Sequence, residues 1–157
     1  MTLTLEPKVC HKVAEELGTL LADTLILYVK TLNFHWNVED PRFTELHKLF
    51  EGQYQELQEM GDEIAERIRM LRQPAPGTMR EFLSLTNLSE AQTKLSGDEM
   101  IKHLALDRHA ISKWLRSKIA ATQDLGDEGT ADLYIQHLRT HDKQAWMLES
   151  HLKGEKR

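Results

Sequence analysis

The sequence has few of the features that mark several protein classes. A single cysteine, Cys10, stands among 157 residues, which excludes an internal disulfide framework and favours a reducing compartment. No apolar run approaches the roughly 20 residues that a membrane-spanning helix requires, and the first residues lack the pattern of a signal peptide. We therefore expect a cytoplasmic protein with no membrane partner.

The sequence also lacks the positive charge of a strong nucleic-acid binder. Its net charge at pH 7 is −5, although protonation of its eight histidines in mild acid would make the balance positive. The apolar fraction of 40% and the charged fraction of 29% are typical of a soluble globular protein. We expect a single domain over residues 1–157, with short flexible tails at about 1–7 and 153–157.

Four long segments carry apolar residues at helical spacing, and no segment shows the alternation of a strand. We expect helices at about 8–37, 42–72, 97–124 and 130–152, separated in the middle by a long connection. Within that connection Thr78 and Glu81 have the spacing of a capping box, which predicts a short helix. One long crossover among four helices predicts an all-α, ferritin-like four-helix bundle.

The second segment carries two pairs of metal-capable residues, His47 with Glu51 and Asp62 with Glu66. At about 100° per residue, all four fall on one stripe of the helix. Along the axis, however, His47 and Asp62 are roughly 22 Å apart, too far for one metal centre. An antiparallel second copy, with its two-fold axis near residues 53–57, would bring the two pairs together. The spacing therefore predicts a metal site between subunits.

The chemistry of these side chains suits iron, because imidazole accepts iron and carboxylates can bridge two ions as iron(III) forms. Ferritin-like di-iron sites inside one bundle use Glu-x-x-His motifs. None of the eight histidines has a glutamate three residues before it, so a site within one bundle is disfavoured. Manganese or zinc at the same ligands stays open, since geometry and availability often decide which metal binds.

Three stretches resemble the Dps family, the dodecameric mini-ferritins of bacteria. They are 33–37 (Asn-Phe-His-Trp-Asn), 43–47 (Phe-Thr-Glu-Leu-His) and 62–67 (Asp-Glu-Ile-Ala-Glu-Arg), within a resemblance that covers essentially the whole chain. The resemblance implies a hollow dodecamer that oxidises iron(II), mainly with hydrogen peroxide rather than oxygen. Ferric mineral would be stored inside the shell, which protects DNA from oxidative damage.

By position, the resemblance also implies the ligands of a site that holds two irons. His35 and His47 resemble the histidines of one subunit, and Asp62 and Glu66 resemble the carboxylates of its partner. Glu51 falls where the family usually has aspartate, so its longer arm shifts the reach of that carboxylate.

Taken one at a time, these residues have ordinary explanations. A lone histidine such as His35 is usually a surface or core residue, and Asp62 with Glu66 would form a solvated face. Trp36 resembles the tryptophan beside the family's metal centre, where it can quench oxidising equivalents, but alone it would indicate core packing. Only the shared stripe, the spacing and the missing intrachain motif together favour metal.

An acidic turn precedes the fourth long segment, with Asp124, Asp127, Glu128 and Asp132. The resemblance implies an iron-entry pore at a three-fold axis, lined by Glu128 and Asp132 with the other two nearby. Carboxylate rings concentrate cations. An acid near a helix start is equally explained by a favourable interaction with the helix dipole.

Two further groups of residues have weaker interpretations. His137 and His141 are four apart and could bind zinc or nickel at the surface, but they lack a protease motif and we expect no function from them. Lys153, Lys156 and Arg157 form a basic carboxyl end that predicts weak or conditional DNA binding, reinforced by many copies. Such binding would make the protein nucleoid-associated.

Two alternatives to an iron-oxidising shell remain open from the sequence. One is a structural protein that compacts the nucleoid and keeps only a vestigial metal site. The other is an inert monomeric bundle whose site residues are accidental.

Overall fold

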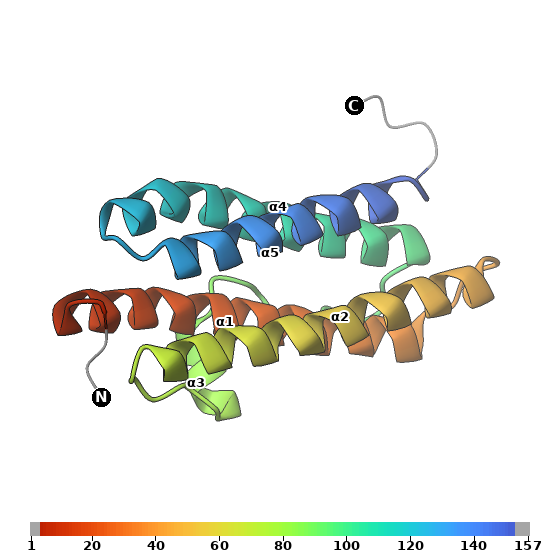
Figure 1. The fold of residues 1–157 in the computed structure, drawn as a ribbon. Coiled ribbons are helices and arrows are strands. Elements are labelled where there is room, and N and C mark those ends of the chain that lie inside the picture. The colour runs from red at the N-terminus through yellow and green to blue at the C-terminus, as the bar shows by residue number, and fades with distance from the viewer. Residues whose placement is uncertain (1–3, 153–157) are drawn as a thin grey trace.

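Five helices make up the described part of the computed structural model, which covers residues 4–152 (Figure 1). They are α1 (Pro7–Asn37), α2 (Phe43–Met70), α3 (Met79–Leu85), α4 (Gly97–Asp124) and α5 (Glu128–Glu149). The described residues contain no strand, and none of these helices has the length and apolar character of a membrane span. The all-α prediction of four long helices, with a short one in the crossover, is confirmed.

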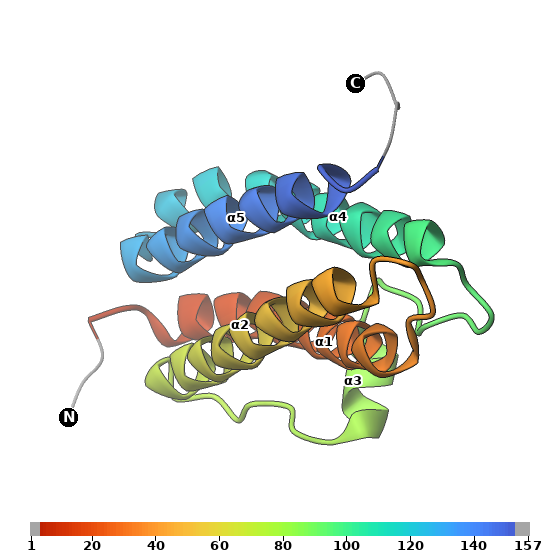
Figure 2. The ribbon, with the colours of Figure 1, turned by 90° about the vertical axis from the view of Figure 1, so that its right-hand side faces the viewer.

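The long helices pair into two hairpins that stack as layers. α1 packs along α2 and α4 packs along α5, with one hairpin above the other (Figures 1 and 2). The crossover between α2 and α4 carries the chain from one layer to the other, and α3 lies against α1 (Figure 2). This is the predicted connectivity, a four-helix bundle with one long crossover.

Apolar stripes on the four long helices fill the space between the layers. Burying one such side chain contributes about 1.5–3 kcal/mol relative to leaving it in water, so each stripe holds its helix in place. Fully buried members include Leu17, Leu20, Leu27, Phe34, Phe50, Leu57, Ile64, Ile68, Leu115 and, on α5, Leu148.

Capping side chains determine where the later helices begin. At α4, Ser96 accepts a hydrogen bond from the backbone of Glu99 and the Glu99 carboxylate accepts one in return, forming the capping box. At α3, Thr78 accepts from the backbone of Glu81. Asp127 caps α5, which therefore begins two residues before the predicted start at 130.

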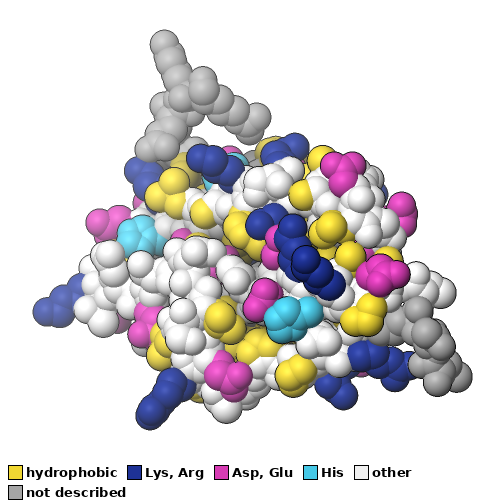
Figure 3. All heavy atoms as spheres, turned by 90° about the vertical axis from the view of Figure 1, so that its left-hand side faces the viewer, with side chains coloured by type: hydrophobic (Ala, Val, Ile, Leu, Met, Phe, Trp, Pro, Cys, Tyr) yellow, Lys and Arg dark blue, Asp and Glu magenta, His cyan; other side chains and the backbone are white. Residues whose placement is uncertain are grey.

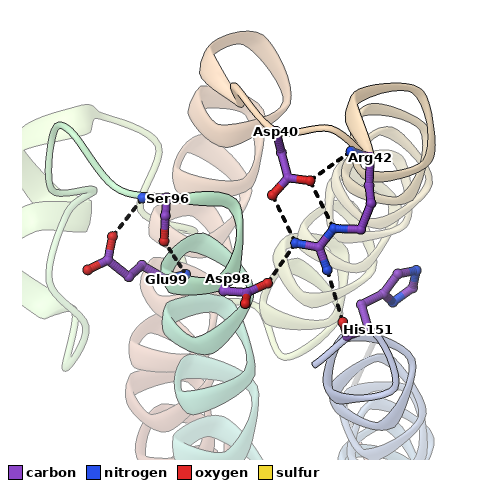
Figure 4. A network of polar contacts seen from close by, with 6 residues as sticks. All are labelled: Asp40, Arg42, Ser96, Asp98, Glu99 and His151. Carbon is purple, nitrogen blue, oxygen red and sulfur yellow. Dashed lines mark hydrogen bonds and ion pairs between the residues drawn. The ribbon is translucent and has the colours of Figure 1, made fainter. Parts of the chain in front are cut away.

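The guanidinium of Arg42 ties the turn between α1 and α2 to the opposite layer (Figure 4). It donates to Asp40 at 2.8 Å, to Asp98 of α4 at 2.6 Å and to the backbone oxygen of His151 at 3.0 Å. The hydrogen bond with Arg42 lowers the pKa of Asp40 to about 2. A Cβ atom on Gly97 would collide with Asp40, so only glycine allows this close approach of turn and helix.

Candidate metal site

His35 and His47 lie against each other where α1 ends and α2 begins. Their imidazole rings are stacked, with centroids 3.8 Å apart and planes at 14°. Each Nδ1 lies 2.8 Å from the backbone oxygen of the other histidine. His35 is buried and His47 is half-buried. The turn between the helices therefore joins two histidines that are distant in sequence into one pair.

The reciprocal hydrogen bonds fix which nitrogen of each imidazole keeps a lone pair. A carbonyl oxygen can only accept, so each Nδ1 donates its hydrogen and the Nε2 of each neutral ring keeps its lone pair. Metal-binding histidines are usually held in this way, by a hydrogen bond from the other ring nitrogen to a carbonyl or carboxylate. The pair thus holds two nitrogen lone pairs in fixed positions, and these could serve as metal ligands.

The predicted carboxylates are spread along α2. Glu51 is half-buried one turn after His47, whereas Asp62 and Glu66 are exposed much farther along the same helix. Among the described residues of one chain, no group of three or more His, Cys, Asp or Glu side chains could hold a metal ion. One subunit therefore brings the two histidines together but does not bring Asp62 and Glu66 to them.

Aromatic side chains surround the histidine pair. The Phe43 ring stacks on His47 with centroids 5.0 Å apart, and the Tyr54 ring meets His35 edge-on at 5.2 Å. Trp36 is 66% exposed and so does not pack in the core of this subunit. The sequence reasoning missed Tyr54. Its position seven residues after His47, two helical turns along one face, was the available signal.

His137 and His141 lie inside the bundle, and the prediction that they lie at the surface is wrong. Their exposed fractions are 2% and 0%. Nε2 of His137 is 3.0 Å from Oε2 of Glu63, and Nδ1 of His141 is 3.2 Å from Nη1 of Arg108. Burial lowers the pKa of both histidines. Both side chains are therefore core residues that join α5 to α2 and α4.

Of the four carboxylates at the acidic turn, one is buried and three are exposed. Asp127 is 1% exposed, and its Oδ1 accepts a hydrogen bond from Nη2 of Arg67 at 2.6 Å. Because Asp127 also caps α5, its carboxylate shapes the turn from inside. Asp124, Glu128 and Asp132 are exposed, and Oδ2 of Asp132 accepts a hydrogen bond from Nε2 of Gln136 at 2.6 Å.

The residues predicted to contact DNA, Lys153, Lys156 and Arg157, lie outside the described residues. Figure 3 shows the end of the bundle where α4 passes into α5, and acidic and basic side chains are interspersed there. The described side chains of that face therefore do not form the continuous basic surface that phosphate binding favours.

Comparison with known proteins gives close matches in sequence. Residues 14–157 match the family model of the ferritin-like domain. DNA protection during starvation protein 2 of Bacillus anthracis is 34% identical over 141 residues, which cover 90% of this chain and 97% of the relative. The DNA protection during starvation protein of Helicobacter pylori is 32% identical over 142 residues, which cover 90% and 99%.

Solved structures match the fold over a similar share of the chain. Dps from Staphylococcus aureus has a TM-score of 0.89 and 35% identity, covering 92% of this chain and 97% of its own. Dps from Vibrio cholerae, a member of a broad superfamily of ferritin-like diiron-carboxylate proteins, has a TM-score of 0.91 and 31% identity, covering 95% and 94%. With this agreement of sequence and fold over nearly the whole chain, the protein belongs to the Dps family of ferritin-like proteins.

Proposed function

We propose that this protein is a ferroxidase and iron-storage protein whose metal site forms between two subunits of a dodecamer. Two iron(II) ions bind between His35 and His47 of one subunit and Asp62 and Glu66 of its partner, with Glu51 adding a carboxylate on the histidine side. The observation that carries the proposal is the stacked histidine pair, whose reciprocal hydrogen bonds leave both Nε2 atoms as metal ligands.

The incomplete ligand set of one chain supports a site shared by two. His35 and His47 supply two nitrogen ligands, but no group of three metal-binding side chains forms within the described part of one subunit. Two copies related by a two-fold axis would each meet the same face of the other. Antiparallel α2 helices would then place Asp62 and Glu66 of one copy opposite the histidines of the next.

The chemistry of oxidation requires two iron ions to act together. Hydrogen peroxide and two protons take one electron from each of two iron(II) ions and give two waters and two iron(III) ions. A single iron(II) ion would instead split peroxide into hydroxide and hydroxyl radical. Carboxylates match the rising charge of the iron, because hard oxygen ligands favour iron(III). The iron(III) is then stored as mineral inside the shell.

Iron reaches the interior through the acidic turn at the start of α5. Asp124, Glu128 and Asp132 are exposed there, and a ring of such carboxylates around a three-fold axis would concentrate iron(II). The ion pair of Arg67 with buried Asp127 holds this turn against the end of α2. The proposed pore residues are thus tied to the end of α2 that carries Glu66.

A complementation experiment tests the shared site. One variant carries His35→Ala and His47→Ala, and the other carries Asp62→Asn and Glu66→Gln. Each alone should lose rapid peroxide-driven iron oxidation while light scattering shows an intact oligomer. Co-assembled subunits should regain about a quarter of the wild-type sites, because half of the dimers are mixed and each has one complete site.

The matched control is His11→Ala with His109→Ala, which removes two exposed histidines elsewhere on the chain. That variant should oxidise iron at the wild-type rate. Failure of the mixed assembly to regain any activity would exclude a site built from both subunits. Unchanged kinetics in the first variant would remove the histidines from the site.

A structural role on DNA is the second candidate function. It is favoured by the names of the relatives, which refer to DNA protection. Removal of iron and peroxide protects DNA without contact, so the two functions are separable by measuring oxidation and DNA retention on the same variants.

A further inference from the structure

Residues 38–42 join the two helix ends that carry the histidine pair. α1 ends two residues after His35, and α2 begins four residues before His47. α3, α4 and α5 each begin with a side chain that accepts a hydrogen bond from the helix backbone, whereas Arg42, at the start of α2, makes no such bond. The start of α2 is therefore held by contacts of another kind.

The side chain of Arg42 supplies those contacts (Figure 4). Its Nε donates to Oδ1 of Asp40 at 2.8 Å and its Nη2 donates to Oδ2 at 2.9 Å, so the guanidinium and the carboxylate form a bidentate pair. Nη2 also donates to Asp98 of α4 at 2.6 Å, and Nη1 donates to the backbone oxygen of His151 at 3.0 Å. One side chain thus fixes the turn internally and also holds it against α4 and the residues that follow α5.

The backbone held by Arg42 leads directly into the ring stack of the candidate site. Phe43 follows Arg42, its ring stacks on His47 with planes at 23°, and the His47 ring stacks in turn on His35. His35 lies in the last turn of α1, where backbone carbonyl groups lack an intrahelical partner, and its oxygen accepts the Nδ1 hydrogen of His47 instead. That hydrogen bond exists only while the two helix ends keep their spacing, which the turn sets.

We propose that Arg42 is a positioning residue for the metal site, because by fixing the turn it keeps the Nε2 atoms of His35 and His47 at the spacing that iron(II) binding requires. This role concerns iron at these two histidines, so it rests on the proposed function. Arg42 acts through the backbone of the turn and through Phe43. Outer-shell residues that orient metal ligands change metal affinity by about 10- to 100-fold when they are replaced.

The arrangement depends on the shape of the arginine side chain as well as on its charge. A guanidinium carries its N–H donors in a fixed planar fork, and Arg42 uses that fork on Asp40, Asp98 and His151 at once. A lysine at this position would keep the positive charge, but its ammonium group could not hold both oxygens of Asp40 and also reach the opposite layer. The geometry therefore separates a charge effect from a positioning effect.

Anaerobic calorimetric titration of the full-length assembled protein with iron(II) tests this role. Arg42→Ala should weaken iron(II) binding by about tenfold or more. Arg42→Lys should weaken it as well, because an ammonium group cannot make the paired hydrogen bonds with Asp40. When peroxide is added, the KM of both variants for iron(II) should rise while kcat stays at the wild-type value, as expected when only binding is lost.

Arg116→Ala is the matched control. Nη2 of Arg116 donates to Oδ2 of Asp142 at 2.7 Å, so this variant also removes an ion pair between an arginine and an aspartate. That pair joins α4 to α5, in the layer opposite to the histidine pair. Arg116→Ala should bind and oxidise iron(II) as the wild type does. Light scattering and melting curves establish that each variant is assembled and folded at the temperature of the titration.

A purely structural role for Arg42 gives a different result. In that case Arg42→Ala and Arg42→Lys lower the melting temperature but bind iron(II) with wild-type affinity while they are folded, and this result would overturn the positioning role. If Arg42→Ala does not assemble, the titration of Arg42→Lys decides between the two roles. Absence of iron(II) oxidation in the wild type would instead refute the proposed function, and the role of Arg42 with it.

Discussion

Nδ1 of His141 lies 3.2 Å from Nη1 of Arg108 in the interior of the bundle, where neither side chain has exposed surface. Arg108 also donates to the amide oxygen of Gln53 at 3.0 Å. Burial lowers the pKa of Arg108 to about 10, so the guanidinium stays charged at neutral pH. Burial first, and Arg108 second, lower the pKa of His141 well below its ordinary 6.5. His141 is therefore neutral in the folded protein.

This arrangement predicts that the fold loses stability in mild acid. Below pH 6.5 the unfolded chain protonates His141 and the folded chain does not, so the free energy of unfolding falls as the pH falls. The slope is about 1.4 kcal/mol per pH unit for each such histidine. His137 adds to it, because burial lowers its pKa although Glu63 opposes the shift.

Denaturation with urea at several pH values below 6.5 measures this slope. His141→Gln should reduce it by about 1.4 kcal/mol per pH unit, because one titrating group is lost. His11→Gln, at an exposed position, is the control and should leave it unchanged. An equal slope in both variants would show that His141 does not cause the acid sensitivity.

Removal of Arg67 should destabilise the bundle strongly. Arg67→Ala leaves the carboxylate of Asp127, which is 1% exposed, without its ion-pair partner. Breaking a buried pair from one side costs about 3–5 kcal/mol, and we expect the lower part of this range because Arg67 is partly exposed. The control Arg69→Ala, two residues along α2 and exposed, should cost about 0.5 kcal/mol or less.

Thermal unfolding of both variants tests whether Arg67→Ala loses more stability than Arg69→Ala. A similar decrease in melting temperature for Arg67→Ala and Arg69→Ala would show that the pair with Asp127 contributes no more than a surface contact.

The charge of Glu51 should matter more than its length. Glu51→Gln keeps the shape but removes the negative charge, and it should weaken iron(II) binding by at least about tenfold. Replacing a residue that only hydrogen-bonds to a metal ligand already lowers metal affinity by about that much. Glu51→Asp restores the family's usual residue and should bind within about tenfold of the wild type. Anaerobic calorimetric titration with iron(II) measures both.

Glu45→Gln, on an exposed face of the same helix, is the control for this titration and should bind as the wild type does. Equal affinity of Glu51→Gln and the wild type would exclude Glu51 from the ligand set.

Removal of the residues after Leu152 should abolish any retention of DNA. The deleted segment contains Lys153, Lys156 and Arg157, and repeated basic tails on one oligomer bind phosphate with a steep dependence on salt. Gel-shift measurements over a range of salt and pH compare the full and shortened chains. Unaltered retention by the shortened chain would exclude the tail as the contact, while unchanged iron oxidation confirms that the shell is intact.

The helices themselves were predictable, because their determinants act within a few residues. Ser96 and Glu99 form their capping box inside one turn, so the start of α4 could be read from spacing alone. The shared stripe of His47, Glu51, Asp62 and Glu66 likewise follows from helix geometry without any tertiary contact. The start of α5 was less accurate, since the cap by Asp127 was not distinguished from a pore role.

The surroundings of the candidate site depend on contacts between distant segments, and local pattern does not encode those. His35 and His47 hydrogen-bond to each other's backbone only because the turn with Asp40 and Arg42 brings α1 and α2 together. His137 and His141 repeat at an ordinary helical spacing, and only packing against α2 and α4 makes them core residues. Sequence by itself determined the helices and the stripe of candidate metal ligands, since both are properties of one helix. The tertiary structure decided which histidines are buried, which tautomer His35 and His47 adopt and which partners they contact. These properties arise only when separate helices exclude water from a common interior.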